Sequence, residues 1–182
     1  MDFRRALPED LTGILRLQSA NLRGSLNLKD QQEGFLSAEF TRRHLVEIAS
    51  EIALLVASDK GQVLGYLCSY SCVYSKQFPI LATMMRSFDH ILYRAKPLSF
   101  YKAFVYGPVC IDKTHRGRGL LRGLYATLLK EVGGRYEVGV AFVSKDNPHS
   151  LTVHVNGLGM AIAGEFEFRR RNYDILAFSV ES

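Results

Sequence analysis

The chain has 182 residues, of which 47% are hydrophobic, and a formal net charge of +5. This length predicts one domain over residues 1–182. No stretch reaches the ~18 apolar residues of a membrane span, and the start has no signal-peptide core, so we expect a cytoplasmic protein that contacts no membrane. The mild positive charge is compatible with an anionic ligand without requiring nucleic acid.

Hydrophobic spacing and turn chemistry predict the elements of the first half. These elements are a strand over 3–7, a helix from Pro8, a polar loop over 21–33, a helix from Ser37 through Ala49, and two strands over 52–57 and 63–73. The turn Asp59-Lys60-Gly61-Gln62 joins the two strands as a hairpin, so we expect an antiparallel pair.

Residues 74–100 form an insert whose apolar residues recur at helical spacing. The recurring residues are Leu81, Met84, Met85, Phe88, Ile91 and Leu92. This spacing predicts one helix from Pro79 to Arg94, closed off by Pro97. Such a helix would serve as core or as a dimer interface. The alternative is a flap over a substrate pocket, with methionines that supply adaptable contacts.

The second half alternates strands with helices. The predicted elements are a strand over 102–112, a helix after Gly119 that ends at Gly133, a strand over 136–144, a short helix over 147–156 and a hairpin over 160–180. Gly107-Pro108 interrupts the first of these strands, and proline cannot donate to a ladder, so this strand should splay. The order predicts a mixed, mostly antiparallel sheet with a parallel splayed central pair and helices on both faces, an α/β fold.

One basic, glycine-containing loop lies between a strand and an amphipathic helix. Its glycines, Gly117 and Gly119, allow a ligand to approach the backbone, while Arg116, Arg118 and Arg122 add positive charge. A helix N-terminus behind such a loop favours an anion, most naturally a phosphate. The glycine spacing fits neither the dinucleotide pattern G-x-G-x-x-G nor the nucleotide triphosphate loop.

Three cysteines, Cys68, Cys72 and Cys110, lie in apolar strand-like runs. This placement predicts buried, reduced thiols and no zinc cluster, so we expect no metal cofactor.

The order of elements and the loop resemble the GNAT superfamily of N-acetyltransferases, whose loop reads Arg/Gln-x-x-Gly-x-Gly/Ala at a strand-to-helix junction. Arg116 and Gly119 match its first and fourth positions, whereas Leu121 stands where Gly or Ala is usual. The resemblance extends over essentially the whole chain. It implies the GNAT-like acyl-CoA N-acyltransferase fold and an enzyme that transfers an acetyl group from acetyl-CoA to a primary amine.

The later motifs of the family also have counterparts. Asn147 and Ser150 match the Asn and the small residue that follow the next strand, and His154 stands at the position of the family's tyrosine. The Leu-Gly-Phe signature looks like Leu158-Gly159-Met160, displaced by one residue.

The resemblance implies which residues bind acetyl-CoA. The backbone of Val109, Cys110 and Ile111 would hold the pantetheine arm and polarise the thioester carbonyl. The pyrophosphate would lie on the amides of Arg116, Gly117, Arg118, Gly119, Leu120 and Leu121. Asn147 and Ser150 would meet the rest of the cofactor.

His154 and Tyr106 are the candidate catalytic residues. His154 would replace the family's tyrosine as the acid that protonates the leaving thiolate, since a neutral imidazole can donate a proton. Tyr106, on the splayed strand, is an alternative polar group near the reaction. The other interpretation of Tyr106 is a residue that packs in the core. For the general base, only Glu33 is suggested, by the position of its loop in the family.

Two other functions remain open from the sequence. The departures at Leu121 and His154 allow a non-catalytic acyl-CoA sensor on the same fold. The arginines of the loop and of Arg169 to Arg171 allow a nucleic-acid binder, although interleaved exposed aromatics are lacking. The amine acceptor is not readable, and the assembly is a monomer or a homodimer.

Overall fold

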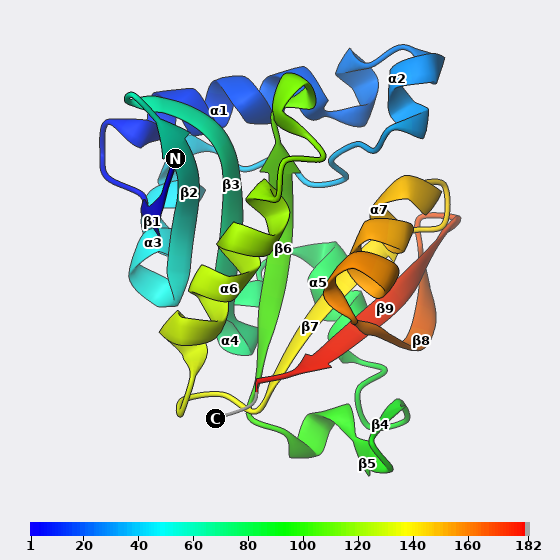
Figure 1. Ribbon diagram of the computed structural model, residues 1–182. Helices are drawn as coiled ribbons and strands as arrows, with labels where there is room; N and C mark the ends of the chain where they lie inside the picture. The colour runs from blue at the N-terminus through cyan, green and yellow to red at the C-terminus, as the bar shows by residue number, and fades with distance from the viewer. Residues whose placement is uncertain (181–182) are drawn as a thin grey trace. The chain divides into compact units, whose positions relative to one another are not determined.

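The computed structural model describes residues 1–180 and confirms the predicted mixed α/β class. Hydrogen bonds link seven strands in the order β1-β2-β3-β6-β7-β9-β8 (Figure 1). β6 and β7 pair in parallel, as the sequence predicted for the central pair. The pairs β1–β2, β2–β3, β7–β9 and β8–β9 are antiparallel. The chain forms two compact units.

Unit 1 comprises Met1–Gln31, Phe35–Ser69 and Gly107–Val132. Its elements include β1 (Asp2–Arg5), α1 (Asp10–Asn21), η1 (Arg23–Ser25), α3 (Arg42–Glu51), β2 (Ala53–Asp59), most of β3 (Gln62–Ser71), the end of β6 (Ala103–Ile111), η3 (Lys113–His115) and α6 (Leu120–Val132). A further short helix, α2 (Leu28–Gln32), follows η1.

Helices cover both faces of the strands of unit 1, because side chains alternate along each strand. Phe3 of β1 points to α6, where a Cβ placed on Gly123 would overlap its ring. Arg4, the next residue, instead reaches the first residue of α1 through Asp10. In Figure 1, α6 passes in front of β2 and β3.

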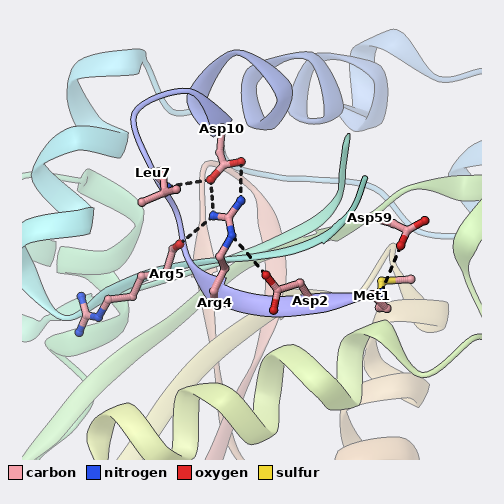
Figure 2. A network of polar contacts seen from close by, with 7 residues as sticks. All are labelled: Met1, Asp2, Arg4, Arg5, Leu7, Asp10 and Asp59. Carbon is pink, nitrogen blue, oxygen red and sulfur yellow. Dashed lines mark hydrogen bonds and ion pairs between the residues drawn. The ribbon is translucent and has the colours of Figure 1, made fainter. Parts of the chain in front are cut away.

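The start of α1 is tied to β1 by Asp10, whose side chain is 4% exposed. Arg4 Nη1 donates to Asp10 Oδ2 at 2.6 Å, and the amide of Leu7 donates to the same oxygen at 2.7 Å (Figure 2). Burial alone would raise the pKa of Asp10, but these two hydrogen bonds outweigh it and hold the pKa below its usual value.

Unit 2 comprises Gln32–Gly34, Tyr70–Tyr106 and the chain from Gly133 onward. Its elements are α4 (Cys72–Ser75), α5 (Pro79–Met85), β4 (Leu92–Tyr93), β5 (Lys96–Pro97), η2 (Leu98–Phe100), the start of β6, β7 (Val138–Ser144), α7 (Pro148–Thr152), η4 (Val153–Gly157), β8 (Ala161–Phe168) and β9 (Arg171–Ser179). α7 continues directly into η4, a single π-helical turn.

The strands of unit 2 also carry structure on both faces. α7 contacts β7, whereas α5 and β4 contact β8. Two glycines make room for neighbouring side chains: Gly139 of β7 lies under the ring of Phe178, its partner on β9, and Gly164 of β8 lies against Ile91. In Figure 1, α7 lies in front of β9, with α5 behind these strands.

The insert differs from the predicted single helix over 79–94. α5 ends at Met85, a series of turns follows, and β4 and β5 form a small hairpin whose tip, Arg94-Ala95, has positive φ angles. The Ser87 hydroxyl donates to Met84 O at 2.6 Å, which occupies a carbonyl at the helix end. Four of the six apolar residues of the pattern, Leu81, Met84, Phe88 and Ile91, are nevertheless buried, whereas Met85 is half-buried and Leu92 is exposed. The helical spacing therefore indicated which side chains are mostly buried, but it did not indicate that the helix continues beyond Met85.

The second predicted helix begins later than expected. α3 starts at Arg42, because the Thr41 side chain accepts a hydrogen bond from the amide of His44, and the His44 side chain accepts one from the amide of Thr41. This reciprocal cap is the true start signal, and Ser37 lies outside the helix. No helix within residues 1–180 combines the length and apolar character needed to cross a membrane.

Candidate functional site

β6 changes neighbours at Gly107-Pro108. Its ladder with β7 extends over Ala103, Phe104 and Val105. The chain then passes through Gly107, with a φ of 106°, and a cis peptide bond to Pro108. Pro108 has no amide hydrogen to donate to a ladder. The strand continues through Val109 to Ile111 in unit 1.

The loop after β6 is shaped by one carboxylate. Asp112 accepts hydrogen bonds from the amide of Thr114 at 3.0 Å and from its hydroxyl at 2.6 Å, and its Oδ1 lies 2.8 Å from His115 Nδ1. Burial pushes the pKa of Asp112 upward, but these bonds outweigh that effect and lower it. The single turn of η3 thereby directs the chain into the glycine loop.

Both glycines of the loop adopt the left-handed conformation, with φ angles of 72° at Gly117 and 83° at Gly119. Both are exposed, and a Cβ placed on either would meet no atom within 4 Å. The 13-residue helix α6 follows at once, and the amide of Gly123 donates to Gly119 O at 3.0 Å. The amides of Leu120, Leu121 and Arg122 therefore precede the first intrahelical bond. This geometry fits an anionic ligand such as a pyrophosphate.

The arginines of the loop divide into two kinds. Arg118 and Arg122 are exposed, and within residues 1–180 neither guanidinium has a hydrogen-bond or ion-pair partner. Arg116 is half-buried and donates to Asn21 Oδ1 at 3.0 Å. Leu121 is half-buried on the first turn of α6. Asn21 is a residue that sequence reasoning missed, since no local signal links two positions so far apart.

Cys110 turns its side chain toward α1. Its Sγ lies 4.0 Å from the carbonyl oxygen of Leu17. Burial raises the pKa of the Cys110 thiol to about 12, although Arg116 opposes the shift. The thiol therefore stays protonated at neutral pH, which disfavours a mechanism in which Cys110 acts as a nucleophile and carries the acetyl group. All three cysteines are free, and Cys68 is buried like Cys110.

Unit 2 brings together the two candidate catalytic side chains. Tyr106 Oη lies 3.1 Å from His154 Nε2, and both residues are buried, at 4% and 5% exposed. His154 Nδ1 lies 2.7 Å from the carbonyl oxygen of Ser150. A carbonyl only accepts, so Nδ1 carries the proton, and Nε2 of the neutral ring accepts from the Tyr106 hydroxyl. Burial lowers the pKa of His154, in keeping with this neutral form.

Asn147 and Ser150 form the start of α7. Asn147 is 4% exposed, and its Oδ1 accepts the amide of Ser150 at 3.2 Å. The segment 32–34 also lies here, because a Cβ on Gly34 would be 3.6 Å from Asn147 Oδ1 and 3.4 Å from the ring of His149. Glu33, the suggested base, is exposed in this segment.

The predicted residues thus gather into two sets, one in each unit. Unit 1 holds Val109, Cys110, Ile111 and the loop from Arg116 to Leu121. Unit 2 holds Tyr106, Asn147, Ser150 and His154. Residues 1–180 contain no group of three or more His, Cys, Asp or Glu side chains that could hold a metal ion.

No protein-family model and no curated relative matches this sequence. Solved structures do match over the whole chain. With yncA, a putative acetyltransferase from Salmonella typhimurium with its cofactor acetyl-CoA, the TM-score is 0.65 at 18% identity, over 100% of this chain and 95% of that chain. With a ribosomal-protein-alanine N-acetyltransferase from Brucella melitensis, it is 0.64 at 19% identity, over 98% and 99%.

A third match is an acetyltransferase of the GNAT family from Streptococcus pneumoniae, with a TM-score of 0.64 at 15% identity, over 99% of each chain. At such identities the likeness concerns the fold. The chain has the fold of GNAT-family acetyltransferases, and the predicted fold is confirmed.

Proposed function

We propose that the chain is an acetyl-CoA-dependent N-acetyltransferase that acts on a primary amine. One observation carries the proposal: on the fold of acetyltransferases, a strand leads into two left-handed, exposed glycines at the N-terminus of a 13-residue helix. The amides at this terminus would hold the pyrophosphate, and Arg118 and Arg122 would add attraction. Leu121 replaces the usual small residue, but it removes no backbone donor.

Acetyl-CoA supplies an acetyl group as a thioester. The backbone of Val109, Cys110 and Ile111 would orient that group, and an amide there would stabilise negative charge on the carbonyl oxygen, at about 2.7–4 kcal/mol for a typical donor. Holding an amine in line with the carbonyl would supply much of the remaining acceleration.

Tyr106 and His154 would handle the proton of the amine. In the neutral pair, His154 Nε2 accepts from Tyr106 and has no proton to give, so the pair is arranged to take up a proton. As the amine nitrogen bonds to the acetyl carbon and the C–S bond breaks, coenzyme A would leave as its thiolate. The amine proton would pass to Tyr106 Oη while the hydroxyl proton moves to Nε2. This arrangement supports His154 as the group that finally accepts the amine proton. The resemblance had instead implied that His154 donates a proton to the leaving thiolate.

Binding is tested by calorimetry with acetyl-CoA and by thermal unfolding. A ligand at 100 times its Kd stabilises the folded state by about 2.7 kcal/mol. The key variant is Gly119→Ala, and Gly134→Ala is the matched control, since Gly134 has a φ of 68° and equally open surroundings. Both add backbone strain of about 1–2 kcal/mol. We expect only Gly119→Ala to weaken acetyl-CoA binding, by about tenfold. Equal affinities in both variants, or no stabilisation of the wild type, would refute the assignment of the loop.

Turnover is tested by release of free thiol from acetyl-CoA with a panel of small amines and peptides. His154→Phe and Tyr106→Phe should each lower kcat by about 10²–10⁴ while the Kd for acetyl-CoA stays unchanged. Full turnover in both variants would leave the enzyme intact and remove the proton-handling role. Binding without thiol release for any amine would favour the acyl-CoA sensor.

A further inference from the structure

The guanidinium of Arg116 is hydrogen-bonded to the strand before the loop and to the end of α1. Its Nη2 donates to Asn21 Oδ1 at 3.0 Å, and its Nε donates to Ile111 O at 3.4 Å. We propose that Arg116 is a positioning residue, which acts through Asn21 to hold the glycine loop against the end of α1, rather than a ligand of the phosphate. Its effect on acetyl-CoA rests on the proposed function, whereas its effect on the loop does not.

Asn21 is oriented to receive this guanidinium. It is the last residue of α1, it is 6% exposed, and its Nδ2 donates to Leu17 O at 2.8 Å. The amide group can thus present only its oxygen to Arg116. The main chain at Asn21 is held as well, since its carbonyl oxygen accepts the amide of Leu36 at 2.8 Å. The side chain and main chain of Asn21 are therefore held in place by contacts other than the one with Arg116.

A second residue that is predicted to bind acetyl-CoA, Cys110 of β6, also contacts the end of α1. The carbonyl of Leu17, which accepts from Asn21, also lies 4.0 Å from Cys110 Sγ. Cys110 and Arg116 stand on either side of the turn that leads into the loop, and both side chains are directed at one turn of α1.

A second link joins the same parts of unit 1 at the surface. Lys113 forms an ion pair with Asp30, and the side chains are 54% and 26% exposed. Exposed pairs of this kind contribute little to stability. The Asn21–Arg116 bond is the less exposed link, with Asn21 buried and Arg116 half-buried, so its removal should loosen the loop, whereas removal of the Asp30 charge should not. This contrast provides a matched control within one unit.

The decisive experiment is hydrogen exchange of the ligand-free, full-length protein. Asn21→Ala and Arg116→Met should each raise the exchange of the amides of His115 and Gly123, which donate to Asp112 O and Gly119 O on either side of the loop, by about tenfold, and Asp30→Asn should change it less than twofold. Arg116→Met keeps the aliphatic stem and the Asn21–Leu17 bond, so it decides the question if Asn21→Ala does not fold. Wild-type exchange in Arg116→Met would overturn the proposal.

Calorimetry with acetyl-CoA supplies the second readout. Asn21→Ala and Arg116→Met should each weaken binding by about tenfold, and the double variant should be no weaker than either, because both remove one interaction. Arg118→Ala should add its loss to that of Asn21→Ala. A direct phosphate ligand would give the opposite result: weak binding in Arg116→Met beside wild-type affinity in Asn21→Ala. If the wild type binds no acetyl-CoA, the proposed function fails, and the exchange measurement alone decides the role of Arg116.

Discussion

His154→Phe is expected to change the pH dependence of stability in a way that reports the charge state of His154 in the folded protein. In the folded protein His154 is buried and neutral, and burial lowers its pKa. In the unfolded chain the imidazole has its ordinary pKa of about 6.5. Below that pH the unfolded chain binds the proton and the folded protein does not. Stability therefore falls as pH falls from about 6.5 toward the lower folded pKa.

The magnitude follows from this linkage. Between pH 7.5 and 5.5, one histidine that protonates only in the unfolded chain costs at most about 1.4 kcal/mol of unfolding free energy. At pH 7.5 the substitution removes the hydrogen bonds of His154 with Tyr106 Oη and with Ser150 O, which costs about 1–3 kcal/mol. The destabilisation caused by His154→Phe should thus be smaller at pH 5.5, by up to about 1.4 kcal/mol.

Urea unfolding at the two pH values measures this difference, with His149→Phe as the control. His149 lies on α7, which continues into η4, and it is exposed, so its substitution controls for the replacement of a histidine by phenylalanine at the surface. A cost of His154→Phe that is equal at both pH values would show that the folded protein protonates His154 near its ordinary pKa. The lowered pKa of buried His154 in the folded protein would then be wrong.

Three further predictions concern packing, charge and thiol chemistry. Gly123→Ala should lower the unfolding free energy by about 1–3 kcal/mol, because the new Cβ would overlap the ring of Phe3. Asp10→Asn should cost about 1–3 kcal/mol at pH 7 by breaking the ion pair with Arg4. Since the pKa of Asp10 is lowered, this cost should shrink as pH falls below about 4. The Cys110 thiol, with a pKa of about 12, should resist aromatic disulfide reagents at pH 8 until the protein unfolds.

Each of these three predictions has a control within the same protein. Gly157→Ala adds a Cβ in open space and should cost less than Gly123→Ala. Asp2→Asn removes an exposed partner of Arg4, 3.6 Å away, and should be nearly neutral. Cys72 is only half-buried and should react before Cys110 in the native protein. A reversal of any of these orders would contradict the packing, the ion pair or the burial from which it was derived.

Local chemistry made much of the fold predictable from the sequence. Apolar runs marked the strands, and the hairpin predicted over 160–180 is present, with its tip at Arg169-Arg170, where both residues have positive φ. Gly117 and Gly119 marked the loop before α6, because glycine meets the steric demands of left-handed turns. Such signals lie within a few residues of the structure they specify.

The insert shows where periodicity stops being informative. The apolar positions from Leu81 to Ile91 are buried as a helical face would be, but turns and a hairpin carry the later ones. Periodicity records which side chains must leave water, and more than one backbone path satisfies that demand. Ile91 packs against Gly164 of β8, and the spacing of residues along the insert does not specify this contact.

The sequence by itself determined the order of elements, the glycine loop and the candidate residues Tyr106 and His154. Only the tertiary structure decided what their side chains do. Arg116 meets Asn21 across 95 positions, and Tyr106 meets His154 across 48. The proton on His154 is placed by the carbonyl of Ser150, and the direction of Arg116 by the end of α1. Hydrogen-bond partners are chosen by proximity in space, which residue spacing along the chain does not encode.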